Sequence, residues 1–236
     1  MEYDNPAERL LSLLRTCKGI SQDMNCRKAW HQVLGTERNE ALMMSRLGKV
    51  MELPHVTVQA LQDSFPNRQA TWSHWSHQVT NAFVSQNLQQ NWSTFISNID
   101  DHSMNYLQMS ADLLQSKATT TLLENDALKS IRNNLDSLYQ ETLGASINDE
   151  VKKYLIRYLR KLLVSLDEYR ITGALPILES VETMLGHVHI DQSYKSFLKD
   201  TELGKKVLDS LASMANLVTV AVGLPQLSQA IMSLPS

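Results

Sequence analysis

The sequence predicts an all-α protein, a multi-helix bundle with short loops and no significant sheet. Apolar residues recur every three or four positions along most of the 236 residues, and Asn, Pro and Gly stand where helices begin and end. An apolar fraction of 43% with 20% charged residues is ordinary for a folded domain. The best strand candidate is residues 187–190, but four residues with no partner cannot form a sheet.

Three short helices are expected in the first fifty residues. Asn5 is a good N-cap, Pro6 suits the first helical position, and Gly19 marks the end of the apolar pattern. Each of the next two helices is expected to begin after a hydroxyl cap and to end at Gly or before Pro. The second helix is expected to have Ser21 as its cap and to end at Gly35. The third is expected to have Thr36 as its cap and to end at Leu53, which precedes Pro54.

Longer helices are expected in the middle of the chain, after a short one at residues 56–65. Apolar and aromatic residues follow helical spacing over residues 72–83, 92–114, 128–139 and 151–169. The last of these keeps one apolar side over about five turns and has Asn148 as its N-cap, so it is the clearest helix of the sequence. Gly173 is expected to end it, and Gly186 to end the shorter helix that follows.

The Thr-rich stretch around residue 119 is the best candidate for a domain boundary. It would separate an N-terminal helical region at residues 1–117 from a C-terminal one at 122–236, although one continuous domain fits the pattern as well. A net charge of −3 and a pI near 6.2 give no general attraction to nucleic acid. The polar, acidic start is unlike a signal peptide, and Cys17 and Cys26 are too few for a disulfide framework, so we expect reduced thiols and a cytoplasmic protein.

No catalytic, cofactor or metal site is expected. The phosphate-loop, Gly-x-Ser-x-Gly and His-Glu-x-x-His signatures are absent. The positions of His187, His189 and Asp191 resemble the start of the metallo-β-lactamase motif His-x-His-x-Asp-His, in which these residue types bind metal. Here Gln192 replaces the final histidine and no histidine follows, so a polar loop is the preferred interpretation.

A charge-free segment, residues 69–99, is the first candidate for function. It contains no Asp, Glu, Lys or Arg, whereas solvated helix faces usually carry charges and the cores of interfaces lack them. The residues expected to face a protein partner are Trp72, His74, Trp75, His77 and Trp92. Two alternatives stay open: the Trp row lies inside and the His row outside, or the Gln- and Asn-rich surface has no function.

A basic stripe is the second candidate. Lys153, Arg157, Arg160 and Lys161 stand at i, i+4, i+7 and i+8, opposite the apolar face of their helix, and such a row can follow a phosphate backbone. An ordinary solvated face is the preferred interpretation, because acidic residues flank the stripe and no interleaved aromatic platform accompanies it.

The uncharged residues 210–236 are the third candidate. A bilayer span needs about 20 consecutive apolar residues. The best run, residues 211–222, is shorter, includes Asn216 and Thr219, and is stopped by Gly223 and Pro225. A buried helix followed by a short amphipathic one is therefore expected.

A Leu-rich helix, the segment Tyr169-Arg170-Ile171-Thr172-Gly173 and a short helix ending at Gly186 follow one another. This order resembles that of small helical accessory proteins encoded in bacterial mobile-element or phage-defence operons. The resemblance covers about a quarter of the chain and implies a subunit of a larger complex, without catalytic residues. We therefore expect a non-catalytic helical subunit or adaptor that binds other proteins or copies of itself. The alternatives are a membrane-active effector that uses the uncharged tail, and a helical nucleic-acid-binding adaptor.

Overall fold

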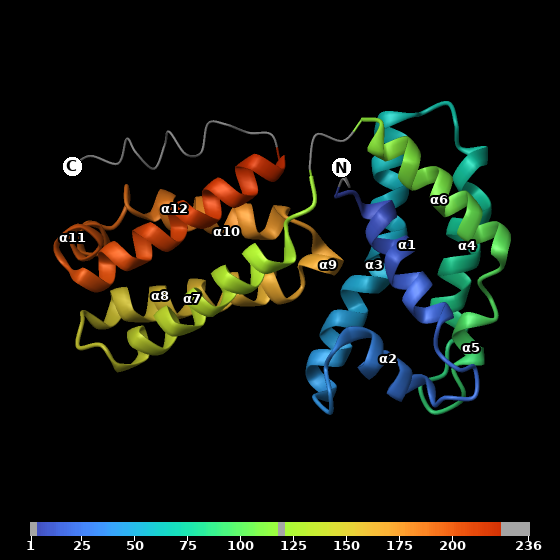
Figure 1. Cartoon of the computed structure of the whole chain (residues 1–236), viewed down its shortest axis with the longest axis horizontal. Helices are drawn as coiled ribbons and strands as arrows, with labels where there is room; N and C mark the ends of the chain where they lie inside the picture. The colour runs from blue at the N-terminus through green and yellow to red at the C-terminus, as the bar shows by residue number, and fades with distance from the viewer. Residues whose placement is uncertain (1–3, 118–120, 223–236) are drawn as a thin grey trace. The chain divides into compact units, whose positions relative to one another are not determined.

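The computed structural model describes residues 4–117 and 121–222, with side chains up to residue 218. The described residues form helices and no sheet, which confirms the predicted all-α class (Figure 1). Contacts between Cα atoms divide the chain into two compact units. The first is Asp4–Ala118, called the N-terminal unit below, and the second begins at Thr119 and is called the C-terminal unit.

The N-terminal unit holds α1 to α6. Both α1 and α4 pack against α3 and α6, and the short α5 packs against α2 and α4. Asn5 caps α1 as predicted, because its Oδ1 accepts a hydrogen bond from the Glu8 N–H at 2.9 Å. The helices span Pro6–Lys18 (α1), Cys26–Leu34 (α2), Glu40–Ser64 (α3), Ala70–Ser85 (α4), Ser93–Ile96 (α5) and Asp101–Gln115 (α6).

The caps of α2 and α3 differ from the prediction. Asn25 and Asn39, not Ser21 and Thr36, accept hydrogen bonds from N–H groups three residues later, at 3.2 and 3.1 Å. Gly35 does end α2, in the left-handed conformation with φ of 58°. The predicted caps lay a few residues too early because several adjacent polar residues have similar capping preference, and sequence alone does not rank them.

Helix α3 runs through Pro54, where the sequence predicted that one helix ends at Leu53 and another occupies residues 56–65. Proline lacks an N–H, so the chain loses one i→i−4 hydrogen bond there. The helix stays continuous because one row of side chains is buried on both sides of the proline, and packing rather than propensity supplies most helix stability. This row contains Met43, Leu47, Val50, Leu53, Thr57 and Leu61.

The predicted helix over residues 92–114 is divided into α5 and α6. Asp100 lies between them with φ of −82° and ψ of 170°, and its carboxylate accepts a hydrogen bond from the Ser103 N–H at 2.6 Å. An acidic N-cap starts a new helix because it satisfies an N–H that has no partner within the helix.

An aromatic cluster forms the core of the N-terminal unit around Trp30. The centroid of the Trp30 ring lies 5.0 Å from that of Trp92, 4.9 Å from that of Phe95 and 6.1 Å from that of Phe83. The first two pairs meet edge to face, an arrangement that aromatic rings favour. This cluster joins α2, the end of α4 and the segment around α5.

The C-terminal unit holds α7 to α12. Here α8 packs against α7 and α10, and α12 packs against α7, α10 and α11. Asn148 caps α8 as predicted, and Gly173 ends the short α9 with φ of 74°. The helices span Asn125–Gly144 (α7), Asp149–Asp167 (α8), Tyr169–Thr172 (α9), Leu175–His187 (α10), Gln192–Asp200 (α11) and Glu202–Val222 (α12).

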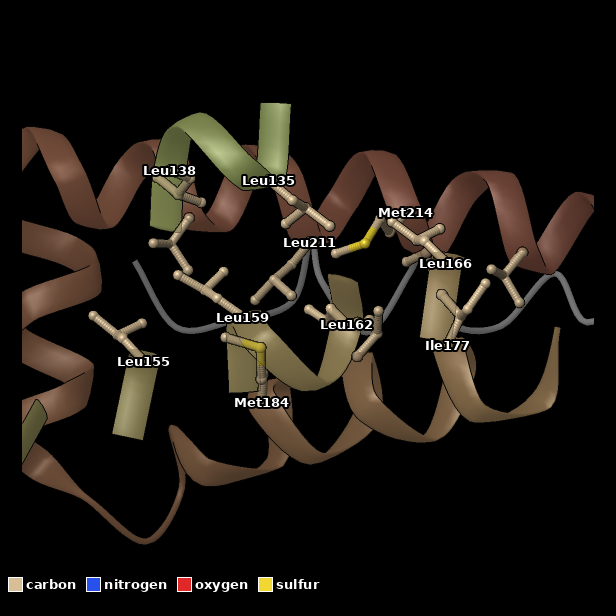
Figure 2. Packing of buried hydrophobic residues seen from close by; sticks show 14 of the residues in the cluster. Leu135, Leu138, Leu155, Leu159, Leu162, Leu166, Ile177, Met184, Leu211 and Met214 are labelled. Atoms are coloured by element: carbon tan, nitrogen blue, oxygen red, sulfur yellow. The ribbon is translucent and has the colours of Figure 1, made fainter. Parts of the chain in front are cut away.

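Leucine side chains from α7 and α8 meet Met and Leu side chains of α10 and α12 in the core of the C-terminal unit (Figure 2). The apolar face of α8 is at the centre of this core, since Leu155, Leu159 and Leu162 are each at most 1% exposed. The burial of this face leaves the opposite face of α8 at the surface.

Residues 187–190 form no strand. Helix α10 passes Gly186, where it was expected to stop, and ends at His187, after which successive turns lead to Asp191. The Asp191 carboxylate then accepts a hydrogen bond from the Tyr194 N–H at 3.0 Å and caps α11. The segment is a connection between two helices.

Part of the uncharged C-terminal segment is covered by its own unit. Among the side chains described, the buried residues of α12 in this segment are Leu211, Met214, Ala215 and Val218. Residues 223–236, the rest of the tail on which the effector hypothesis depends, lie outside the described residues. Among the residues described, no helix is both long and apolar enough to cross a membrane.

Two glycines of the C-terminal unit give a matched test of this packing. A Cβ on Gly204 would lie 2.1 Å from the Phe197 carbonyl oxygen and 2.6 Å from the Leu198 Cα, backbone atoms that no change of rotamer can move. A Cβ on the exposed Gly186 would meet nothing within 4 Å. We expect Gly204→Ala to lower the free energy of unfolding by about 3 kcal/mol, and Gly186→Ala to raise it by up to about 1 kcal/mol. Urea denaturation measures both, and equal effects of the two changes would contradict the close approach of α11 and α12.

Candidate functional site

The three tryptophans of the charge-free segment lie in the core of the N-terminal unit. Trp72 is 2% exposed, and Trp75 and Trp92 are 0% exposed. The Trp75 Nε1–H donates to the Ser110 Oγ at 3.0 Å, and the Trp92 Nε1–H donates to the Cys17 carbonyl at 3.0 Å. The prediction that these tryptophans face a partner is therefore wrong, because their rings pack within the unit and two of the three N–H groups bond inside it.

The two histidines of the predicted site lie on the opposite, exposed side of α4. His74, His77, Asn81 and Val84 follow one another at helical spacing, and the Asn81 side-chain nitrogen lies 3.4 Å from the His77 Nδ1. Val84 is 78% exposed, a large fraction for an aliphatic side chain. This arrangement agrees with the alternative interpretation of the sequence, in which the tryptophans lie inside and the histidines lie at the surface.

Helix α6 extends this surface through a contact with His74. The ring centroids of His74 and Tyr106 are 6.3 Å apart, and Met109 lies one turn further along α6. Tyr106 is 39% exposed and Met109 52% exposed. We call the surface made of His74, His77, Val84, Tyr106 and Met109 the α4–α6 face. Sequence patterns did not single out Val84, Tyr106 and Met109 as surface residues, because single apolar residues on polar helix faces give no signal of their own.

Asp100 is a charged group that contacts this face. Its carboxylate lies 3.1 Å from the His74 Nε2. The pKa of Asp100 is lowered from its ordinary value of 3.8, first by the hydrogen bond from the Ser103 N–H and further by the His74 ring. The carboxylate is thus ionised at neutral pH and holds the His74 side chain near the start of α6.

The basic stripe lies on the exposed side of α8. Its four residues, Lys153, Arg157, Arg160 and Lys161, are all exposed. The structure adds aromatic partners that sequence spacing did not reveal. The Arg160 guanidinium donates to the Tyr139 hydroxyl at 2.7 Å, and the Arg157 guanidinium carbon lies 5.7 Å from the centre of the Tyr158 ring.

His187 of the His-x-His-x-Asp segment belongs to an aromatic cluster. His187 stacks on Tyr154 with ring centroids 3.7 Å apart, and its Nε2 lies 3.3 Å from an Asp191 oxygen. His189 is exposed. No group of three or more His, Cys, Asp or Glu residues suited to a metal ion occurs in the described part of the chain. Tyr194 is fully buried beside this pair, and burial raises its pKa, so its hydroxyl stays neutral.

The cysteines and the groove between α7 and α12 offer little reactivity. Cys17 and Cys26 are free and buried, and burial raises the pKa of both thiols, which keeps them protonated and poorly nucleophilic. The groove has a volume of about 400 Å³ and three charged lining residues, Glu141, Lys206 and Asp209. Glu141 and Lys206 pair with each other at 2.8 Å. These two charges therefore already neutralise each other and are not available to a ligand.

Comparison with known proteins adds no assignment to these surfaces. No protein family, curated protein or solved structure matches this chain. Its function must therefore be argued from the surfaces themselves.

Asp100 gives a pH-dependent prediction for the α4–α6 face. Since its folded-state pKa is lowered, the stability that its charge contributes is complete above about pH 3.8 and is lost as the pH falls through the folded-state pKa. Asp100→Asn keeps an N-capping oxygen without the charge, whereas Asp100→Ala removes the cap and should cost about 1 kcal/mol at pH 7. Urea denaturation at neutral pH and at about pH 3 should show that the Asn variant is less stable than the wild type at neutral pH and that this difference is smaller at the lower pH. An equal difference at both pH values would contradict the role of the charge.

Proposed function

We propose that this chain is a non-catalytic helical subunit or adaptor that binds another protein through the α4–α6 face. The observation that carries the proposal is the combination of exposed apolar side chains with an absence of charged residues on α4. All 16 residues of α4 are uncharged when histidine is neutral, although about half of the helix lies at the surface. Val84 on α4 and Met109 on α6 are 78% and 52% exposed. The cores of protein interfaces show this depletion of charge and an enrichment in Tyr and Met.

The α4–α6 face suits a partner surface of aliphatic, aromatic and amide groups. Tyr106 and the histidines combine an apolar ring with a hydrogen-bonding atom, and Met109 adapts its shape to a neighbour. His74 is already held by Asp100, so part of the face is ordered before binding, which lowers the entropy cost of association. A bacterial defence complex is the assembly that we propose for such a subunit.

A docking function makes a specific prediction for Val84 and Met109. Val84→Glu and Met109→Glu each place a charge in the proposed interface, where it would be desolvated without a partner, so each should weaken binding at least about tenfold. Neither side chain is buried, so the melting temperature should change little. Met44→Glu is the matched control, because Met44 is 48% exposed on α3 in the same unit, outside the α4–α6 face.

The measurement is co-purification of the tagged full-length chain from its native cells, followed by quantitative mass spectrometry. A stoichiometric protein that is lost from both interface variants and retained by the Met44 control supports the proposal. Light scattering of the purified chain shows whether that partner is a second copy. Equal recovery of bound proteins by the wild type and both interface variants would contradict the role of the α4–α6 face.

A further inference from the structure

The outer face of α8 has an unusual run of positive charge. Residues 151–166 include five cationic residues and no acidic one, within a unit whose charged residues are otherwise mixed in sign. Four of the five, Lys153, Arg157, Arg160 and Lys161, make up the basic stripe. Like charges at this spacing repel one another, so α8 gains nothing in stability from this arrangement.

In the described part of the chain, the cations of the basic stripe have no carboxylate partner. Among the described residues, no Asp or Glu oxygen lies within 4.0 Å of any of the four side-chain cations. Two other cations of the same unit are paired, since Arg132 Nε lies 2.6 Å from Asp167 and Lys206 Nζ lies 2.8 Å from Glu141. The charge of the stripe is therefore not neutralised by ion pairs within the unit.

Aromatic rings accompany the two arginines of the stripe. The Arg160 guanidinium carbon lies 5.7 Å from the centre of the Tyr139 ring. A guanidinium N–H of Arg160 donates to the Tyr139 hydroxyl, which positions the side chain across the α7–α8 contact. Arg157 lies at the same distance from the Tyr158 ring. Tyr139 and Tyr158 are only partly buried. Arginine and tyrosine side by side provide both the cation for a phosphate and planar groups for a nucleobase.

The dimensions of the stripe match one strand of a nucleic acid. At 1.5 Å of rise per residue, the row from Lys153 to Lys161 is about 12 Å long, enough to contact roughly three successive phosphates of a single strand. A membrane surface is a poorer match, because a helix that lies on lipid inserts an apolar face. The apolar face of α8 is instead buried in the core of its own unit (Figure 2).

We propose that the basic stripe of α8, together with Tyr139 and Tyr158, binds the phosphate backbone of single-stranded nucleic acid without sequence preference. This activity is additional to the proposed docking function and uses the other unit of the chain. Electrostatic contacts to phosphate make affinity fall with salt, by about 0.7 in log K per unit of log salt concentration for each phosphate contacted on a single strand.

The test is fluorescence anisotropy of a labelled oligothymidylate of about 20 nucleotides with the full-length protein, over a series of salt concentrations. We expect binding at low salt with a slope of about −2, as three contacts require. Arg157→Gln with Arg160→Gln should reduce the slope by about 1.4 and weaken binding at low salt at least about tenfold.

The matched control is Lys129→Gln with Lys199→Gln. It removes the same two positive charges from exposed positions on α7 and α11, outside the stripe. We expect this control to bind within about twofold of the wild type. Equal weakening in the two double variants would assign binding to net charge and overturn the proposal. Absence of oligonucleotide binding would also overturn it, whether or not the protein binds phosphatidylserine vesicles. Circular dichroism of each variant verifies that it is folded.

Discussion

Buried indole N–H groups constrain the packing of the N-terminal unit, because each needs an acceptor in a core that excludes water. The indoles of Trp30, Trp75 and Trp92 find acceptors just after α4, on α6 and at the end of α1. These bonds commit the Trp side of α4 to the interior. Helical geometry then places His74 and Val84 at the surface, so the candidate interface is a consequence of the core.

The C-terminal unit shows the same dependence of surface on core. The leucines of α8 pack among α7, α10 and α12, which directs the basic stripe outward and brings Tyr139 of α7 against Arg160. The two proposed binding surfaces thus differ in chemistry and lie in different units. One is partly apolar and formed largely by an uncharged helix, which suits a protein, and the other is cationic and aromatic, which suits a polyanion. A chain with both would connect a protein to a nucleic acid.

Local signals predicted much of the fold. The caps at Asn5 and Asn148 and the helices around α4 and α8 follow from capping and apolar periodicity, which act within one or two turns. The prediction failed at Pro54, where a buried row of side chains keeps α3 continuous despite a lost hydrogen bond. It failed again where α5 and α6 divide, because an acidic N-cap inside an apolar pattern can be read either as a helix start or as a helical residue.

The sequence alone determined the helical class, most helix positions and the unusual residues of both candidate surfaces, namely the charge-free segment and the basic stripe. Only the tertiary structure decided which side of each helix is available. A helix without charged residues offers little contrast between its faces, so neighbouring helices decided that the tryptophans lie inside and the histidines outside. Contacts between residues far apart in the sequence, such as Tyr139 with Arg160 and Tyr106 with His74, leave no trace in local periodicity, because they arise only when separate helices pack together.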